Sequence, residues 1–227
     1  MTEAVMIFAA GFGTRMGDLT KTTPKPMIPV AGKPLIDHAL DYVTGAGIDR
    51  VVVNTHYLAN QLQDHLRPKG VLISHEADEI LDSGGGLKAA LPLLETAIPF
   101  TLNPDVLWLG PNPLDLLRQQ WDPDRMDALL LCTPLERCHG RQGGGDFAQG
   151  HAGRITRPGD LVYGGAQIIR TDMVRDWPEP VFSLNQVWNR MSDAGRLHLA
   201  VYPGEWCDIG TPDGIPLAET LLEQPRV

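Results

Sequence analysis

Residues 4–17 read AVMIFAAGFGTRMG, and this stretch decides how the chain begins to fold. Its first half, from Ala4 to Ala10, is a short and fully apolar run of the kind that forms a buried strand. The run ends in a loop with glycines at positions 11, 13 and 17, where backbone N–H groups can turn toward an anion without interference from a Cβ. The stretch therefore predicts a strand that opens directly into an anion-binding loop.

The glycine spacing disfavours two common phosphate-binding loops. Position 16 is Met, so the spacing is not G-x-G-x-x-G, and no G-K-[ST] closes a Walker A loop. Dinucleotide binding and P-loop hydrolysis are both disfavoured for this reason. The segment is nevertheless basic, because four bases outnumber two acids within residues 1–35. The bases are Arg15, Lys21, Lys25 and Lys33, and the acids are Glu3 and Asp18.

Apolar runs then alternate with helical patterns along the first half of the chain. Short apolar or β-branched runs predict strands, and apolar residues at helical spacing predict helices. This alternation predicts an α/β chain with a mainly parallel sheet and right-handed crossovers. The predicted strands are residues 4–10, 50–54, 71–74 and 100–102, and the predicted helices are residues 35–45, 57–66 and 87–94.

The second half of the chain is less regular and contains no linker or low-complexity segment. We expect one domain with an inserted or appended substrate-binding portion, and residues 119–125 as a surface loop between the halves. The predicted strands are residues 128–132, 154–156, 163–169 and 197–202, and the predicted helices are residues 184–191 and 211–222.

Composition limits the classes of partner. The 227 residues carry a net charge of −9, which disfavours general binding to nucleic acid or to an anionic membrane. The chain has three cysteines and no CxxC pair among them, namely Cys132, Cys138 and Cys207. We therefore expect neither a disulfide framework nor a structural zinc site, and we expect the protein to work in a reducing cytoplasm. No apolar stretch reaches the roughly 20 residues that span a bilayer, and the N-terminal run lacks the basic start of a signal peptide.

The first loop and the segment after it resemble the sugar-1-phosphate nucleotidyltransferases, also called sugar-nucleotide pyrophosphorylases. Their first strand is followed by A-G-x-G-T-R-[ML] and then by x-P-K-P-[ML]-x-P-V-x-G-x-P-[LM]-I. The matching segments are residues 10–16 and 23–36. Molybdenum-cofactor guanylyltransferases share a similar R-M-G but place a lysine just after it, whereas Lys25 follows Arg15 by ten positions.

This resemblance implies a Rossmann-like three-layer α/β sandwich with a mixed, mainly parallel central sheet, similar to the GT-A fold. It also implies a single nucleotidyltransferase domain over residues 1–227. Residues 1–110 would form the nucleotide-binding half, and residues 111–227 the sugar-phosphate-binding half with a second metal ligand.

In that family the glycine loop and the proline-flanked lysine bind the nucleotide. Arg15 would contact the triphosphate and Lys25 the phosphates at the reacting centre, where transfer needs negative charge to be neutralised. Residues 78–86 resemble E-x-L-x-T-G-G/A-G, a loop that closes over the nucleoside, and Glu76 stands where relatives read the base. The nucleotide-binding residues implied are Ala10, Gly11, Gly13, Thr14, Arg15, Lys25, Glu76, Gly84 and Gly85.

Two carboxylates are expected to hold Mg²⁺. Asp105 follows a predicted strand, at the edge where open α/β sheets bind ligands. It matches the Asp of the family's N-[GSA]-D, although Pro104 replaces the small residue and stiffens the turn. Asp208 matches the second ligand in W-x-D-[IV]-G-T-P, and two carboxylates with phosphate oxygens and waters suffice for Mg²⁺. The catalytic residues implied are Arg15, Lys25, Asp105 and Asp208.

The sugar side is expected in the second half of the chain. Arg157 precedes a proline where many relatives have a lysine that holds the sugar's phosphate, and arginine can grip phosphate bidentately. Residues 138–147 and 182–191 resemble a short bacterial subgroup that includes N-acetylmuramate α-1-phosphate uridylyltransferases. The sugar-phosphate-binding residues implied are Asn103, Asp146, Arg157, Gly165 and Asn185.

The resemblance implies transfer of a nucleoside monophosphate, from UTP in this subgroup, to an amino-sugar or muramic-acid 1-phosphate, with release of pyrophosphate. The acceptor is mostly dianionic at neutral pH, so no protein nucleophile or general base is required. Guanylyl transfer to mannose 1-phosphate, cytidylyl transfer to a phosphoester such as phosphocholine, and a catalytically silent homologue remain open. A dinucleotide-dependent oxidoreductase is opposed by the glycine spacing. We expect a cytoplasmic monomer or weak homodimer.

Overall fold

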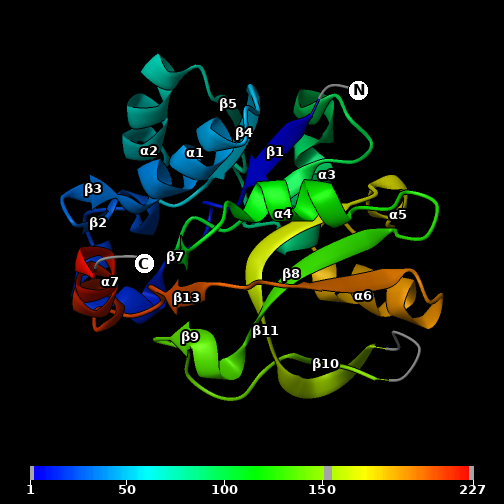
Figure 1. The fold of residues 1–227 in the computed structure, drawn as a ribbon. Coiled ribbons are helices and arrows are strands. Elements are labelled where there is room, and N and C mark those ends of the chain that lie inside the picture. The colour runs from blue at the N-terminus through cyan, green and yellow to red at the C-terminus, as the bar shows by residue number, and fades with distance from the viewer. Residues whose placement is uncertain (1–2, 151–154, 225–227) are drawn as a thin grey trace.

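Strand β1 (Ala4–Ile7) lies within the central sheet, and all four of its side chains are buried. A computed structural model describes residues 3–150 and 155–224 of the chain. In it β1 pairs in parallel with β4 (Arg50–Thr55) and with β6 (Phe100–Leu102), and β4 pairs in parallel with β5 (Leu72–His75). Helices α1 (Leu35–Gly45), α2 (Ala59–Leu66) and α3 (Asp82–Leu94) connect these strands (Figure 1).

The second half of the chain extends the same sheet with mixed strand directions. Strand β11 (Ile155–Ile169) runs antiparallel between β6 and β8 (Ala128–Pro134), and β12 (Leu197–Val201) runs parallel to β8. Strand β10 (Phe147–Gln149) pairs antiparallel with β11. Within the described residues the order is β12-β8-β11-β6-β1-β4-β5, with β10 beside β11, which confirms the mixed, mainly parallel sheet.

Two strands that the sequence predicts separately form a single strand in the structure. Residues 155–156 and 163–169 both belong to β11, and Arg154 lies outside the described residues. The long strand is continuous because its partner changes along it, from β10 at its start to β8 and β6 further on.

A small second sheet was not predicted. It joins β7 (Val106–Leu109), β13 (Glu205–Asp208) and β9 (Cys138–His139) in the order β7-β13-β9. The antiparallel register of β13 on β7 sets Asp208 opposite Val106. Segments about 100 residues apart in sequence therefore meet beside the central sheet. Strands β2 (Pro29–Val30) and β3 (Lys33–Pro34) form a separate hairpin.

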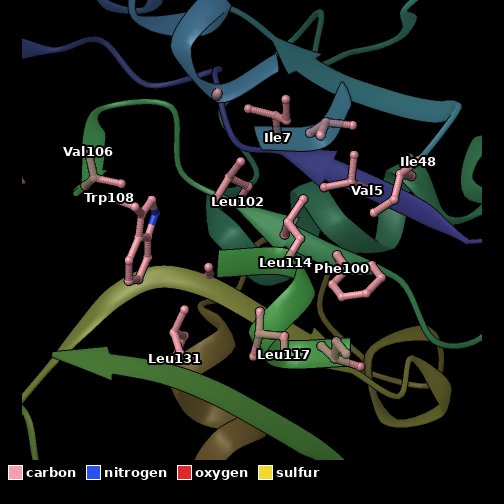
Figure 2. Packing of buried hydrophobic residues seen from close by; sticks show 14 of the residues in the cluster. Val5, Ile7, Ile48, Phe100, Leu102, Val106, Trp108, Leu114, Leu117 and Leu131 are labelled. Carbon is pink, nitrogen blue, oxygen red and sulfur yellow. The ribbon is translucent and has the colours of Figure 1, made fainter. Parts of the chain in front are cut away.

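Helices cover both faces of the sheet and make three layers. Helices α1, α2 and α4 (Pro113–Gln120, not predicted) pack on one face, where Val5 and Ile7 point (Figure 2). Helices α3, α5 (Asp172–Arg175) and α6 (Leu184–Asp193) pack on the other, where Ala4 and Met6 point. Helix α7 (Gly214–Glu223) packs in a third apolar cluster with the first loop. Among the described helices, none is long and apolar enough to cross a membrane.

Helix α3 begins five residues before its predicted start at Leu87. The glycines at 84–86, predicted as a loop, form its first turn and are buried. A Cβ on Gly84 would collide with the ring of Phe182, and one on Gly85 with the backbone of Pro180. Close packing of this helix therefore requires glycine, and tertiary contacts outweigh the low helix propensity from which the loop was predicted.

Candidate active site

Two cavities meet at Asp105, beyond the carboxyl ends of the parallel strands. The smaller has a volume of about 220 Å³ and is lined by the loop after β1. The larger, of about 550 Å³, extends toward β11 and α6. Phe8, Gly11 and Asp105 line both of them. A ligand that fills the two cavities would place its reacting atoms beside Asp105.

The first loop packs tightly on Lys25. Gly13 has a φ of +65°, in the left-handed region, and a Cβ there would lie 2.8 Å from the Cβ of Lys25. The hydroxyl of Thr20 donates a hydrogen bond to the Gly13 carbonyl at 3.2 Å, which helps to fix the turn. Gly11, Gly13, Thr14, Arg15 and Lys25 all line the smaller cavity, and Ala10 lines the larger.

The structure brings the four predicted catalytic residues together. The Lys25 ammonium donates to Oδ2 of Asp105, and this lysine side chain is only 11% exposed. Arg15 Nη1 lies 4.0 Å from Oδ2 of Asp208. The carbonyl of Asp105 accepts a hydrogen bond from the Ile209 N–H at 2.9 Å, which ties the two acidic segments to each other.

Pro104 does not displace the acidic side chain that follows it. The proline is buried and itself lines the smaller cavity, while Asp105 reaches Lys25. The stiffer turn predicted at this proline is thus compatible with a carboxylate placed at the cavity junction.

The electrostatics of the two carboxylates suit a divalent cation. Burial raises the pKa of Asp208, the neighbouring charge of Asp105 raises it further, and Arg15, Lys25 and Arg141 partly offset both effects. Two carboxylates close enough to repel one another are stabilised when a cation lies between them. Their oxygens, with phosphate oxygens and water, are the donors that Mg²⁺ prefers. The residues present therefore fit the metal that the sequence predicts.

Glu76 is a buried anchor at the end of β5. Its Oε1 accepts from the Asn54 amide at 2.7 Å, and its Oε2 from the Leu81 N–H at 2.9 Å. Asn54 in turn accepts from the Ala9 N–H at 2.6 Å, so the carboxylate is linked to the loop after β1. Glu76 still lines the larger cavity, and each oxygen keeps a second lone pair.

Gly84 and Gly85, which the sequence predicts as nucleotide-binding residues, lie behind the cavity rather than on its wall. Their N–H groups donate to the carbonyl of Phe182 at 2.9 and 3.1 Å, and neither glycine is part of the wall of the two cavities. Of the segment 78–86 predicted to close over the nucleoside, residues 82–86 form the first turn of α3, where the glycines are buried, while Ile80 and Asp82 line the larger cavity. Ser83 lines the larger cavity at this point, and its hydroxyl accepts from the Leu184 N–H at 3.0 Å.

Asn103 and Gly165 are neighbours at the junction of β6 and β11. The Asn103 N–H donates to the Gly165 carbonyl at 2.8 Å, and a Cβ on Gly165 would lie 2.8 Å from that of Asn103. Asn103 lines the larger cavity, while Gly165 supports it from behind.

Asp146, Arg157 and Asn185 line the far part of the larger cavity. Asp146 accepts from the Tyr163 N–H at 2.9 Å, and Arg157 donates to Oδ1 of Asn185 at 2.8 Å. All five predicted sugar-phosphate residues thus lie on, or directly behind, one cavity wall.

A family model described as the MobA-like NTP transferase domain matches residues 5–202. The chain belongs to this family. Together with curated relatives that include sugar-1-phosphate uridylyl- and guanylyltransferases, this match confirms the predicted class, a sugar-1-phosphate nucleotidyltransferase.

Among curated relatives, N-acetylmuramate alpha-1-phosphate uridylyltransferase of Caulobacter vibrioides is 36% identical over 98% of both chains. The catalytic subunit beta of mannose-1-phosphate guanylyltransferase of Danio rerio is 28% identical over 91% of this chain and 61% of its own. A solved UDP-glucose pyrophosphorylase complexed with UDP-glucose superposes over the whole of both chains with a TM-score of 0.80 and 18% identity. The solved structure of HddC from Yersinia pseudotuberculosis superposes with a TM-score of 0.78 and 22% identity, and the match covers 98% of this chain and 100% of the other. These structures support the nucleotidyltransferase fold.

Sequence reasoning missed Arg141 in this transferase. The residue lines the larger cavity, and its guanidinium donates to Oδ1 of Asp146 at 2.7 Å. Strand β9 places it near Asp208, because β9 pairs with β13 and Gly140 packs against the Asp208 carbonyl. Arg141 lies within the segment 138–147 that resembles the bacterial subgroup, but a single arginine has no periodicity, and its place in the site follows from the strand pairing.

Proposed function

We propose that this protein transfers the uridylyl group of UTP to N-acetylmuramate 1-phosphate or a closely related amino-sugar 1-phosphate, releasing pyrophosphate. The observation that carries this proposal is the 36% identity to the Caulobacter uridylyltransferase over 98% of both chains. The two cavities that join at Asp105 give the two substrates a place consistent with that reaction.

The smaller cavity binds the triphosphate. Arg15 and Lys25 supply cationic side chains there, and Gly11, Gly13 and Thr14 let phosphate oxygens approach the backbone closely. The nucleoside extends past Ala10 toward Glu76 in the larger cavity. Because α3 holds Gly84 and Gly85 away from the cavity, we assign them to packing rather than to nucleotide contact.

The acceptor binds in the remainder of the larger cavity, among Asn103, Asp146, Arg157 and Asn185, with Gly165 behind Asn103. An oxygen of its phosphate forms a new bond to the α-phosphorus of UTP. The bond from that phosphorus to the oxygen of the β-phosphate breaks, and the electron pair leaves with pyrophosphate.

Asp105 and Asp208 would hold Mg²⁺ at the cavity junction. Bound there, the ion would neutralise phosphate charge and align the two reactants. Lys25 and Arg15 would stabilise the leaving pyrophosphate from the side of the smaller cavity.

Guanylyl transfer to mannose 1-phosphate is the second candidate, favoured by the match to the Danio rerio subunit over 91% of this chain. Glu76 does not decide between the bases. A carboxylate can accept a hydrogen bond from the imide N–H of uracil or from N1–H of guanine.

The test is a panel of reactions on the purified full chain. Each of the four nucleoside triphosphates is combined, with Mg²⁺, with muramic-acid, glucosamine or mannose 1-phosphates, and pyrophosphate release is measured. The proposal expects UTP with N-acetylmuramate 1-phosphate to give the highest kcat/KM. A preference for GTP with mannose 1-phosphate would overturn it in favour of the second candidate. No release with any pair would indicate a silent homologue.

A further inference from the structure

The loop after β1 carries Arg15, yet little of it is packed into the protein. Its 3-10 helical segment, Thr14–Thr20, has two buried residues, Met16 and Thr20. The Arg15 side chain is 64% exposed, and the distance between Arg15 Nη1 and Oδ2 of Asp208 is 4.0 Å. Packing of its own side chain therefore does not fix Arg15, so the backbone that carries it has to be held by its two buried anchors.

Thr20 is the polar one of these anchors. Its hydroxyl lies 3.2 Å from the carbonyl oxygens of both Gly13 and Gly17, so it closes the loop on itself. Its own carbonyl accepts a hydrogen bond from the Tyr57 hydroxyl at 2.8 Å. Because Thr20 is buried, removal of that donor would leave a buried carbonyl with one partner fewer, which is costly. The Tyr57 hydroxyl thus fastens the end of the segment that includes Arg15.

Tyr57 lies between β4 and α2 and is itself held in place. The Phe12 ring packs edge-on against the rings of His56 and Tyr57, at centroid distances of 5.6 and 5.5 Å. His56 Nδ1 donates a hydrogen bond to the Glu76 carbonyl at 2.6 Å. The turn after β4 therefore joins the loop of the smaller cavity to the strand end that bears Glu76.

We propose that Tyr57 is a positioning residue for the triphosphate, which acts by holding Thr20 and thereby the backbone that carries Arg15. This inference rests on the proposed function, because it takes the smaller cavity as the triphosphate site. Tyr57 is not among the described residues that line the two cavities, so its hydroxyl acts through the loop and not by contact with the nucleotide. A loop that is already held in its binding conformation loses less entropy when the phosphates bind.

The experiment removes the single hydroxyl in Tyr57→Phe. Calorimetric titration of the purified full chain with UTP and Mg²⁺ should give a Kd about 3–10-fold above that of the wild type, which corresponds to one hydrogen bond. KM for UTP should rise to a similar extent. By contrast, kcat at saturating UTP and KM for the acceptor should stay within about twofold of the wild type, because the cost is met when the triphosphate binds.

Tyr202→Phe is the matched control. The Tyr202 hydroxyl also donates to a backbone carbonyl, that of Pro111 at 3.0 Å, and Tyr202 is not among the described residues that line the cavities. Because Tyr202 is fully buried, this variant should lower the melting temperature at least as much as Tyr57→Phe, while the Kd of UTP stays unchanged. An equal loss of UTP affinity in the two variants would show a general effect of instability and would overturn the inference. So would an unchanged Kd in Tyr57→Phe.

A double-mutant cycle with Arg15→Gln tests whether Tyr57 acts through Arg15. The rise in KM for UTP caused by Tyr57→Phe should be smaller in the Arg15→Gln background than in the wild type, since the two residues act as a unit. Full additivity of the two changes would overturn the inference.

The same cycle separates this inference from the proposed function. The triphosphate is common to all four nucleotides, so if the wild type uses GTP the uridylyl transfer fails, and the cycle is measured with GTP. Coupling between Tyr57 and Arg15 would then still support the inference. If UTP is the donor and Tyr57→Phe binds it as the wild type does, the uridylyl transfer stands and the inference is overturned. A wild type that binds no nucleoside triphosphate would overturn both.

Discussion

Gly13→Ala should destabilise the protein more than the same substitution at Gly70, and the difference measures how tightly the first loop packs on Lys25. Both glycines have left-handed backbone, with φ and ψ of 65° and 29° at Gly13 and of 72° and 15° at Gly70. An alanine in this conformation costs about 1 kcal/mol at either site. Gly70 has open space around it, so this strain is the whole of its expected loss.

At Gly13 a steric term is added to the backbone strain. The new Cβ would lie 2.8 Å from the Cβ of Lys25 and 2.9 Å from Cγ2 of Thr20. Neither atom is the end of a flexible chain, so relief requires a backbone shift, which typically costs about 1–3 kcal/mol. The melting temperature of Gly13→Ala should therefore be about 2–12 °C below that of Gly70→Ala.

Thermal unfolding of the two variants, followed by circular dichroism, measures the difference in stability. Pyrophosphate release provides the second measurement, because a displaced Lys25 would raise KM for the triphosphate in Gly13→Ala and not in Gly70→Ala. Equal melting temperatures would refute the reasoning, since they would mean that the loop moves away from Lys25 without loss.

Three further predictions concern the metal site, an ion pair and a thiol. Asp208→Asn should lower Mg²⁺-dependent pyrophosphate release at least about a hundredfold, because metal stabilisation is worth several kcal/mol; near-normal release would contradict the metal role. Hydrogen bonds from Arg118 hold the pKa of Glu3 below its usual value. The stability from this pair is fully present above the unfolded-state pKa of about 4.3 and is lost as pH falls through the lower folded-state pKa. In Glu3→Gln, the free energy of unfolding, measured by urea denaturation, should therefore change less with pH in this acid range than in the wild type. An unchanged dependence on pH would count against the ion pair's contribution. Burial raises the pKa of Cys138 to about 11, so iodoacetamide at pH 8 should alkylate it far more slowly than free glutathione, as measured by peptide mass spectrometry; comparable rates would disprove the burial argument.

The parallel half of the fold could be predicted because each of its elements is encoded locally. Helix α1 and strand β6 have the predicted bounds, since their apolar patterns end at clear breaks in the sequence. Strand β7 was missed because it follows the Asn103–Asp105 turn at once, so the segment reads as one loop. Helix α4 is only eight residues long, too short for its pattern to stand out.

The site could be predicted only in part, because its geometry depends on pairings that are distant in sequence. The register of β13 on β7, which sets Asp208 beside the Asp105 segment, leaves no local signal. Resemblance to a family, rather than periodicity, supplied that pair. Glycines such as Gly84 point to a turn by propensity, and their need for close contact with Phe182 becomes visible only in the folded chain.

The charge pattern of the site explains how a chain with a net charge of −9 can bind two phosphate substrates. Lys25 and Arg15 each lie beside a carboxylate, Asp105 and Asp208 respectively. Because every charge has a partner, the array can be partly buried in the free protein without the penalty of an isolated ion. Under the proposed reaction, Asp105 and Asp208 would hold Mg²⁺, and Lys25 and Arg15 would be available to the triphosphate. Asp105 and Asp208, two of the residues that make the chain negative, would then take part in binding anions. The local arrangement of charges at the site, rather than the net charge of the chain, would decide whether phosphates bind there.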